Sequence, residues 1–208
     1  MIVFSVAPPT SRSMFARTVG CPTLSLNEIL AITETAHAHG IPVTAHVDTA
    51  RDVQRALEGG VDDLAHPSGT TLSNTLIEQL VAADIAMVST LAVFGASPIP
   101  SNNLWRFAEA GGTIALGNDA GYLTGVRVGA PIEEIRALYS AGFSPMQIIT
   151  FATINAAEVC RLSDRIGSLE LGKQADVLVV EGDPLADVET LASTLLVIHR
   201  GSVIVDNR

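Results

Sequence analysis

Three residues that can bind a metal ion end or directly follow three of the buried strands that the sequence predicts: His46, His66 and Asp119. The carboxyl ends of parallel strands meet at one edge of a sheet, which is where enzymes with parallel sheets hold their reactive groups. Neutral imidazoles together with a carboxylate suit zinc or a similar divalent ion. A single histidine at such a place is more often a structural, hydrogen-bonded residue, but three metal-capable side chains at three strand ends favour a metal centre.

The carboxylate of Asp119 lies in a segment suited to a sharp turn. Four residues of β-type, apolar character (113–116) run into Gly117-Asn118-Asp119, and the glycines on both sides, Gly117 and Gly121, allow the backbone to turn. A turn aspartate that caps the next helix is the alternative interpretation. The two histidines expected at the same edge favour the metal ligand.

A second histidine pair, His37 and His39, has the H-x-H spacing of many metal sites, but it lies in a predicted helix that ends at Gly40. Side chains two positions apart on a helix point roughly 200° apart around its axis. They do not converge on one ion. We therefore interpret these two residues as exposed histidines at a helix end.

Strands and helices alternate along the first part of the chain. The predicted strands are residues 2–6, 42–46, 61–66, 85–90 and 113–116, and the helices between them include residues 51–57, 73–83 and 103–110. Such alternation with short connections predicts a parallel sheet with right-handed crossovers. Three more helices are expected at about 131–141, 145–151 and 153–161. Short strands follow at 166–169, 175–180, 195–199 and 202–205. The last two of these strands are expected to form a hairpin around Arg200-Gly201. This change places a domain boundary between residues 163 and 164.

The composition narrows the class of partner. Hydrophobic residues make up 48% of the 208 residues and aromatic residues only 4%, with a mean hydropathy of +0.38. An aliphatic-rich, aromatic-poor chain suits parallel strands covered by helices on both faces. A formal net charge of −10 without a basic stripe argues against nucleic acid or an anionic membrane as a partner.

The sequence also predicts a cytoplasmic protein. Residues 1–6 are apolar but too short, and lack the basic flank, for a signal peptide, and no apolar run reaches membrane-spanning length. The two cysteines, Cys21 and Cys160, fit no metal or redox motif, which agrees with a reducing compartment. Cys160 lies in a helical pattern, and we expect it to be a small core residue.

Five segments resemble motifs of the amidohydrolase superfamily, in that family's order and spacing. Residues 60–66 (GVDDLAH) are similar to its strand-6 motif G-V-D-x-I-E-H, and residues 114–121 (IALGNDAG) to its strand-8 motif I-A-L-G-T-D-A-G. Residues 36–46 resemble its strand-5 segment, residues 152–157 (ATINAA) its A-T-x-N-A-A helix, and residues 166–176 (IGSLELGKQAD) the entry into its composite β-domain. The resemblance covers about residues 25–208 and is strongest to the imidazolonepropionase and prolidase-like subgroup.

The resemblance implies an α/β fold of a particular kind. Residues 1–163 would form part of a (β/α)8 TIM-type barrel, about its last four or five βα units, and residues 164–208 the β-rich tail of a composite β-sandwich domain. By motif position, His46 and His66 would be metal ligands, and Asp119 a ligand that also acts as general base. The reaction would be the hydrolysis of a carbon–nitrogen bond in a non-peptide or cyclic amide by a metal-activated water.

Two features of that family are missing from this sequence: the first-strand H-x-H pair and the strand-4 lysine that bridges two metals. The only lysine, Lys173, belongs to the β-domain motif, and Val3 would stand at the lysine's place if residues 2–4 form strand 4. We therefore expect one ion rather than two. Three alternatives stay open: the C-terminal part of a longer enzyme, a barrel completed by another chain or in a homo-oligomer, and a non-catalytic fragment with an open sheet that works only by association.

A small molecule is the expected substrate. The loops at residues 91–102 and 122–129, mostly apolar and small, are expected to line its pocket. Arg127 is the cation there that could bind a substrate carboxylate, and Tyr122 could also contact substrate. A solvent-exposed arginine and a packed tyrosine are the alternatives.

Overall fold

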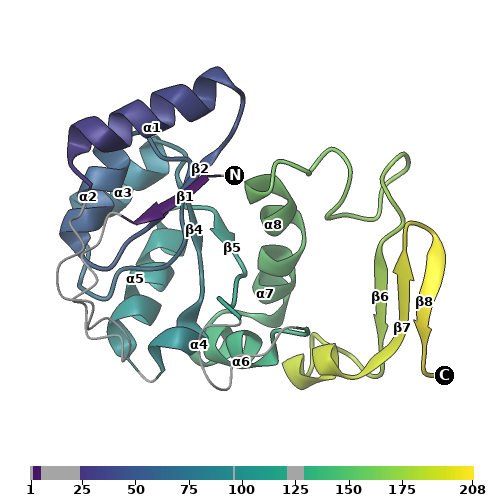
Figure 1. The fold of residues 1–208 in the computed structure, drawn as a ribbon. Helices are drawn as coiled ribbons and strands as arrows, with labels where there is room; N and C mark the ends of the chain where they lie inside the picture. The colour runs from purple at the N-terminus through teal and green to yellow at the C-terminus, as the bar shows by residue number, and fades with distance from the viewer. Residues whose placement is uncertain (1, 6–23, 96, 121–128) are drawn as a thin grey trace. The chain divides into compact units, whose positions relative to one another are not determined.

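The structure of the chain is a computed structural model that describes residues 2–5, 24–95, 97–120 and 129–208 (Figure 1). It divides into two compact units, Met1–Ile114 and Ala115–Arg208. The predicted substrate contacts Tyr122 and Arg127 lie outside the described residues. The predicted domain boundary between residues 163 and 164 falls inside the second unit and stays a prediction.

The first unit is built on a parallel sheet. Its strands are β1 (Ile2–Ser5), β2 (Val43–His46), β3 (Asp63–Leu64), β4 (Ala86–Val88) and, crossing the boundary of the unit, β5 (Ile114–Ala115). They are ordered β1-β2-β3-β4-β5, and the first three pairings are parallel. The predicted α/β class with a parallel sheet is therefore confirmed.

The described helices of the first unit follow the strands in the chain: α1 (Leu26–Ala38), α2 (Ala50–Glu58), α3 (Asn74–Ala82), α4 (Leu91–Phe94) and α5 (Pro98–Glu109). Side chains cap several of these helices at their N-termini by accepting hydrogen bonds from backbone N–H groups of the first turn. Ser25 and Glu28 form a capping box at the N-terminus of α1, with the Ser25 N–H donating to Glu28 Oε2 at 2.7 Å. This hydrogen bond and one from the Ser25 hydroxyl lower the pKa of Glu28.

The segment after β4 differs from the prediction. Residues 91–102 were expected as a loop before a helix at Asn103, but α4 occupies its start and α5 already begins at Pro98. The first turn of a helix has no partners for its backbone N–H groups, so Pro98 and Pro100 are tolerated there without loss of a hydrogen bond. The two prolines were therefore misinterpreted as loop residues.

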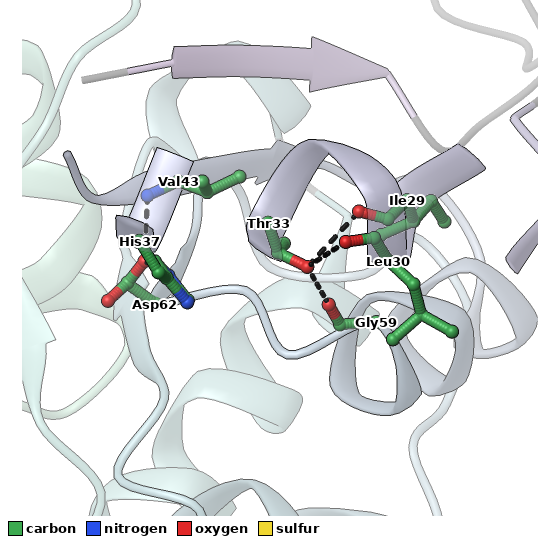
Figure 2. Close-up of polar contacts among 7 residues, drawn as sticks. All are labelled: Ile29, Leu30, Thr33, His37, Val43, Gly59 and Asp62. Atoms are coloured by element: carbon green, nitrogen blue, oxygen red, sulfur yellow. Dashed lines mark hydrogen bonds and ion pairs between the residues drawn. The ribbon is translucent and has the colours of Figure 1, made fainter. Parts of the chain in front are cut away.

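Figure 2 shows how α1 is fastened to the start of β2 and to the end of α2. The Thr33 hydroxyl donates to the Gly59 carbonyl at 2.7 Å. Asp62 accepts a hydrogen bond from the Val43 N–H at 2.7 Å and lies 2.8 Å from His37 Nε2. These contacts hold α1 beside the start of β2 and the end of α2.

The same contacts confirm the interpretation of His37 and His39. Both are exposed. His37 pairs with Asp62, whereas His39 Nδ1 lies 2.9 Å from the Thr35 carbonyl oxygen. The two rings thus have separate partners and do not meet at one ion.

The second unit contains helices α6 (Ile132–Ser140), α7 (Pro145–Ala152) and α8 (Ile154–Val159), and then an antiparallel sheet. This three-stranded sheet consists of β6 (Val177–Val180), β7 (Thr194–His199) and β8 (Ser202–Asp206), with a 3-10 helix, η1 (Val188–Ala192), between β6 and β7. The predicted hairpin is present: Arg200 and Gly201 both have positive φ, 50° and 77°, as a type I′ turn requires.

Two expectations for the second unit were wrong. Residues 166–169 are not a strand, because Gly167 has φ +93° and the Ile166 N–H bonds back to the Leu162 carbonyl in a turn. Cys160 is exposed rather than in the core, since it is the C-cap of the short helix α8. The predicted helix is present, but it ends at this residue.

None of the helices in the described parts of the chain is long and apolar enough to cross a membrane.

Candidate metal centre

His46 is the last residue of β2, and its orientation follows from the alternation of a strand. Val43 and Ala45 are fully buried on one face of β2, so Thr44 and His46 lie on the other. Thr44 is 5% exposed, and its hydroxyl has no hydrogen-bond partner among the residues that the structure describes. His46 is half-buried at the carboxyl end of the strand.

His66 follows β3 and is brought beside His46 by backbone pairing. The Ala65 N–H donates to the Ala45 carbonyl at 2.9 Å, which continues the parallel pairing of β2 and β3 past the short strand. The centroids of the His46 and His66 rings are 4.8 Å apart, and the ring planes are 83° from parallel. The predicted neighbourhood of these two histidines is therefore present in the structure.

The spacing of the two rings fits a shared metal ion. Two imidazoles bound to one tetrahedral zinc, with Zn–N bonds of about 2.0–2.1 Å, have ring centres about 5 Å apart. The 4.8 Å separation of His46 and His66 matches this value, and both side chains are donors that zinc prefers. Two aromatic rings packed edge-to-face without a metal have the same spacing. Metal analysis, rather than the distance, distinguishes a shared metal ion from such a ring pair.

His66 contacts the short helix that follows β4. Its Nδ1 lies 2.8 Å from the Thr90 hydroxyl, and its ring stands edge-to-face to Phe94 with centroids 6.4 Å apart. Thr90 is the N-cap and Phe94 the last residue of α4, so one helical turn provides both contacts. His66 is 9% and Thr90 2% exposed. Because Thr90 engages Nδ1, a metal on His66 would be bound through Nε2.

A buried amide holds the segment that follows His66. Asn103, on α5, is fully buried, and its amide donates to the carbonyls of Ser68 and Thr70 at 3.0 and 2.8 Å. Its Oδ1 accepts from the Leu72 N–H at 3.0 Å. All three hydrogen bonds end on the backbone of the loop between β3 and α3, so α5 sets the course of the chain directly after the histidine.

Asp119 belongs to the second unit. It is exposed and follows β5 in a turn in which Asn118 Oδ1 accepts from the Ala120 N–H at 3.3 Å. No group of three or more His, Cys, Asp or Glu side chains that could hold a metal occurs within the described ranges. The participation of Asp119 in a centre with His46 and His66 stays a prediction.

The chain matches the model of the Amidohydrolase family over residues 17–204. It belongs to that family. This membership confirms the resemblance drawn from the five motifs.

Imidazolonepropionases are among its relatives. That of Brevibacillus brevis is 27% identical over 174 residues, which are 83% of this chain and 40% of the relative. That of Symbiobacterium thermophilum is 32% identical over 162 residues, which are 75% of this chain and 37% of the relative. The chain thus spans about 40% of the length of these curated relatives.

Solved structures of longer chains share the fold. A Xaa-Pro dipeptidase with bound methionine in its active site aligns with 97% of this chain and 53% of its own, at a TM-score of 0.83 and 25% identity. Phenylurea hydrolase B aligns with 100% of this chain and 53% of its own, at a TM-score of 0.79 and 26% identity. This chain therefore corresponds to about half of each.

Two residues around the histidines were not predicted from the sequence. Thr90 ends the strand predicted at residues 85–90, so a hydroxyl at a strand end was a signal that could have been followed. Asn103 carried no such signal, because a buried asparagine in a helix is indistinguishable in sequence from its exposed neighbour Asn102.

Proposed function

We propose that the chain carries the metal-binding part of a hydrolase that cleaves carbon–nitrogen bonds of non-peptide or cyclic amides. The observation that carries the proposal is the histidine pair: His46 and His66 lie at neighbouring strand ends with ring centroids 4.8 Å apart, in a chain that belongs to the Amidohydrolase family. Relatives named imidazolonepropionase and a solved neighbour named phenylurea hydrolase B support the type of bond.

The proposed architecture is part of a (β/α)8 barrel over residues 1–163, followed by a β-rich tail over residues 164–208. Support comes from the parallel pairing of β1 to β4, with helices between the strands, and from the aligned solved structures. β1 and β5 lie at the two ends of the sheet order, and a closed barrel has no free edges. Closure therefore calls for strands beyond those in the described part of the chain, which the remainder of a longer protein, another chain or a second copy would supply.

The proposed ligands are His46, His66 and Asp119, for one zinc or similar divalent ion. Such an ion, when bound, polarises the scissile carbonyl and lowers the pKa of a water molecule. Asp119 would accept a proton from the attacking water and deliver it to the leaving nitrogen.

A single ion is proposed because this chain offers no lysine to bridge two. Its sole lysine, Lys173, donates to the Ser168 hydroxyl at 2.6 Å and lies 3.3 Å from a Glu170 carboxylate oxygen. These contacts lie in the turn that precedes β6.

Metal analysis of histidine variants tests the proposal. The purified chain, dialysed against a zinc-containing and then a zinc-free buffer, should retain about one equivalent of zinc when measured by mass spectrometry of the metal. His46→Ala and His66→Ala should lose it. The matched control is His39→Ala, which removes an exposed histidine at a helix end and should leave the zinc content unchanged.

Hydrolysis assays extend the test to the reaction. A panel of cyclic amides and phenylureas should show turnover by the zinc-loaded protein, and Asp119→Asn should lower it by about 10²–10⁴-fold, the usual contribution of a general base. Absence of stoichiometric zinc in the wild-type chain would refute the metal centre. Zinc binding without turnover would instead indicate a non-catalytic fragment, and the molar mass in solution would then show whether it exists as an oligomer.

A further inference from the structure

Thr90 has a backbone conformation that its side chain disfavours. Its φ of 43° and ψ of 31° lie in the left-handed helical region, which a β-branched residue rarely adopts. The residue is 2% exposed and stands between β4 and α4. Such a conformation persists where the surrounding structure requires it, and it is often found at functional sites.

The hydroxyl of Thr90 does not perform the task expected at its position. A threonine at a helix N-cap normally accepts a hydrogen bond from a backbone N–H of the first turn. Thr90 makes no such bond to α4, and its hydroxyl lies instead 2.8 Å from Nδ1 of His66. The strained backbone thus directs the side chain away from the helix and onto the histidine.

We infer that Thr90 is a positioning residue for the metal centre. When Nε2 of His66 binds a metal, Nδ1 carries the proton, and the Thr90 oxygen is placed to accept it. This contact would fix both the tautomer and the ring orientation of His66, while Phe94 supports the ring from the same helix. The inference rests on the proposed function, because it concerns the affinity of the same centre.

Two variants of Thr90 separate the hydroxyl from the shape of the side chain. Thr90→Val keeps the branching at Cβ, and therefore the same backbone strain, but removes the hydroxyl. Thr90→Ser keeps the hydroxyl and removes the methyl group. Partners of metal-binding histidines change metal affinity by about 10–100-fold when they are lost, so Thr90→Val should raise the zinc dissociation constant by about that factor while Thr90→Ser stays close to the wild type.

The experiment measures zinc affinity of the full chain by competition with a chromophoric chelator. Cobalt(II) replaces zinc in a second measurement, because its visible absorption bands report the ligand geometry, and these should change in Thr90→Val but not in Thr90→Ser. Urea denaturation of the metal-free proteins supplies the control. A purely structural role of Thr90 would lower the free energy of unfolding but would leave the zinc affinities of Thr90→Val and Thr90→Ser equal. If Thr90→Val does not fold, Thr90→Gly relieves the left-handed strain and carries the same prediction for zinc.

The two proposals fail in different ways. A wild-type chain that binds zinc, together with a Thr90→Val variant of equal affinity and unchanged cobalt spectrum, would overturn the role of Thr90 and leave the metal centre intact. A wild-type chain that binds no zinc would overturn the proposed function and the role of Thr90 together.

Discussion

The loop after His66 is held by one buried side chain, and replacing that side chain should have a measurable cost. Asn103→Ala removes the amide that bonds to the carbonyls of Ser68 and Thr70 and to the N–H of Leu72. Thr70 keeps a second donor to its carbonyl, the Ser68 hydroxyl at 2.9 Å. The Ser68 carbonyl and the Leu72 N–H lose the amide and have no replacement for it in the variant.

The magnitude follows from these two groups. Leu72 is 1% exposed and Ser68 fully buried, so solvent does not readily replace the amide. A buried polar group without a partner costs about 1–3 kcal/mol, which gives a loss of about 3 kcal/mol in the free energy of unfolding after some relaxation of the loop. Domains of this size are stable by only about 5–15 kcal/mol, so the loss is a large fraction of the total.

The assay is urea denaturation followed by far-ultraviolet circular dichroism. With a urea dependence of about 2 kcal/mol per molar, the midpoint of Asn103→Ala should lie about 1.5 M below that of the wild type. Asn102→Ala is the matched control, because the neighbouring asparagine on α5 is exposed, and a surface change of this kind alters stability by about 0.5 kcal/mol or less. If the two variants unfold at the same urea concentration, the amide of Asn103 does not hold the loop and the reasoning is refuted.

Two further predictions concern packing and pH. A Cβ added at Gly59 would overlap the buried side chain of Ile29, so Gly59→Ala should lower the free energy of unfolding by about 1–3 kcal/mol. Adding Ile29→Leu removes the overlapping γ2 methyl group and should recover part of this loss. If the effects of the two substitutions on the free energy of unfolding simply add, the contact between Gly59 and Ile29 is contradicted. Hydrogen bonds from Arg208 lower the pKa of Asp206 to about 2. Because the folded-state pKa is depressed, the stabilisation is present above the unfolded value of about 3.9 and is lost as the pH falls toward 2. An NMR titration should show the Asp206 midpoint rising toward the unfolded value in Arg208→Ala, and an unchanged midpoint would rule out this cause.

The neighbourhood of His46 and His66 could be predicted from the sequence because it depends on chain order. Strands that alternate with helices pair in parallel, so consecutive strand ends lie side by side whatever the details of packing. The strand lengths were less well predicted: residues 61–66 were expected as one strand, but β3 comprises only Asp63–Leu64 and His66 follows it. The position of the histidine was therefore correct even though its secondary structure was not.

The support around the histidines could not be predicted because it depends on tertiary contacts. The four residues of α4 are too few for a periodic pattern, and its N-cap, Thr90, makes no capping hydrogen bond. The amide of Asn103 reaches a loop far away in sequence, which no local pattern reveals. Both residues lie in segments where strands or helices were expected, but what they touch is decided by the packing of α4 and α5.

Positive φ values outside glycine have two kinds of setting in the described residues. Outside glycine, φ is positive at Asp84, Thr90, Asp119, Arg161 and Arg200. Two of these directly follow helix C-caps and one lies in the β7–β8 hairpin, where left-handed residues are common. Thr90 and Asp119 have no such explanation, and each follows a strand of the parallel sheet, β4 or β5. Aspartate adopts this conformation more readily than the β-branched threonine, so the backbone strain is larger at Thr90 than at Asp119.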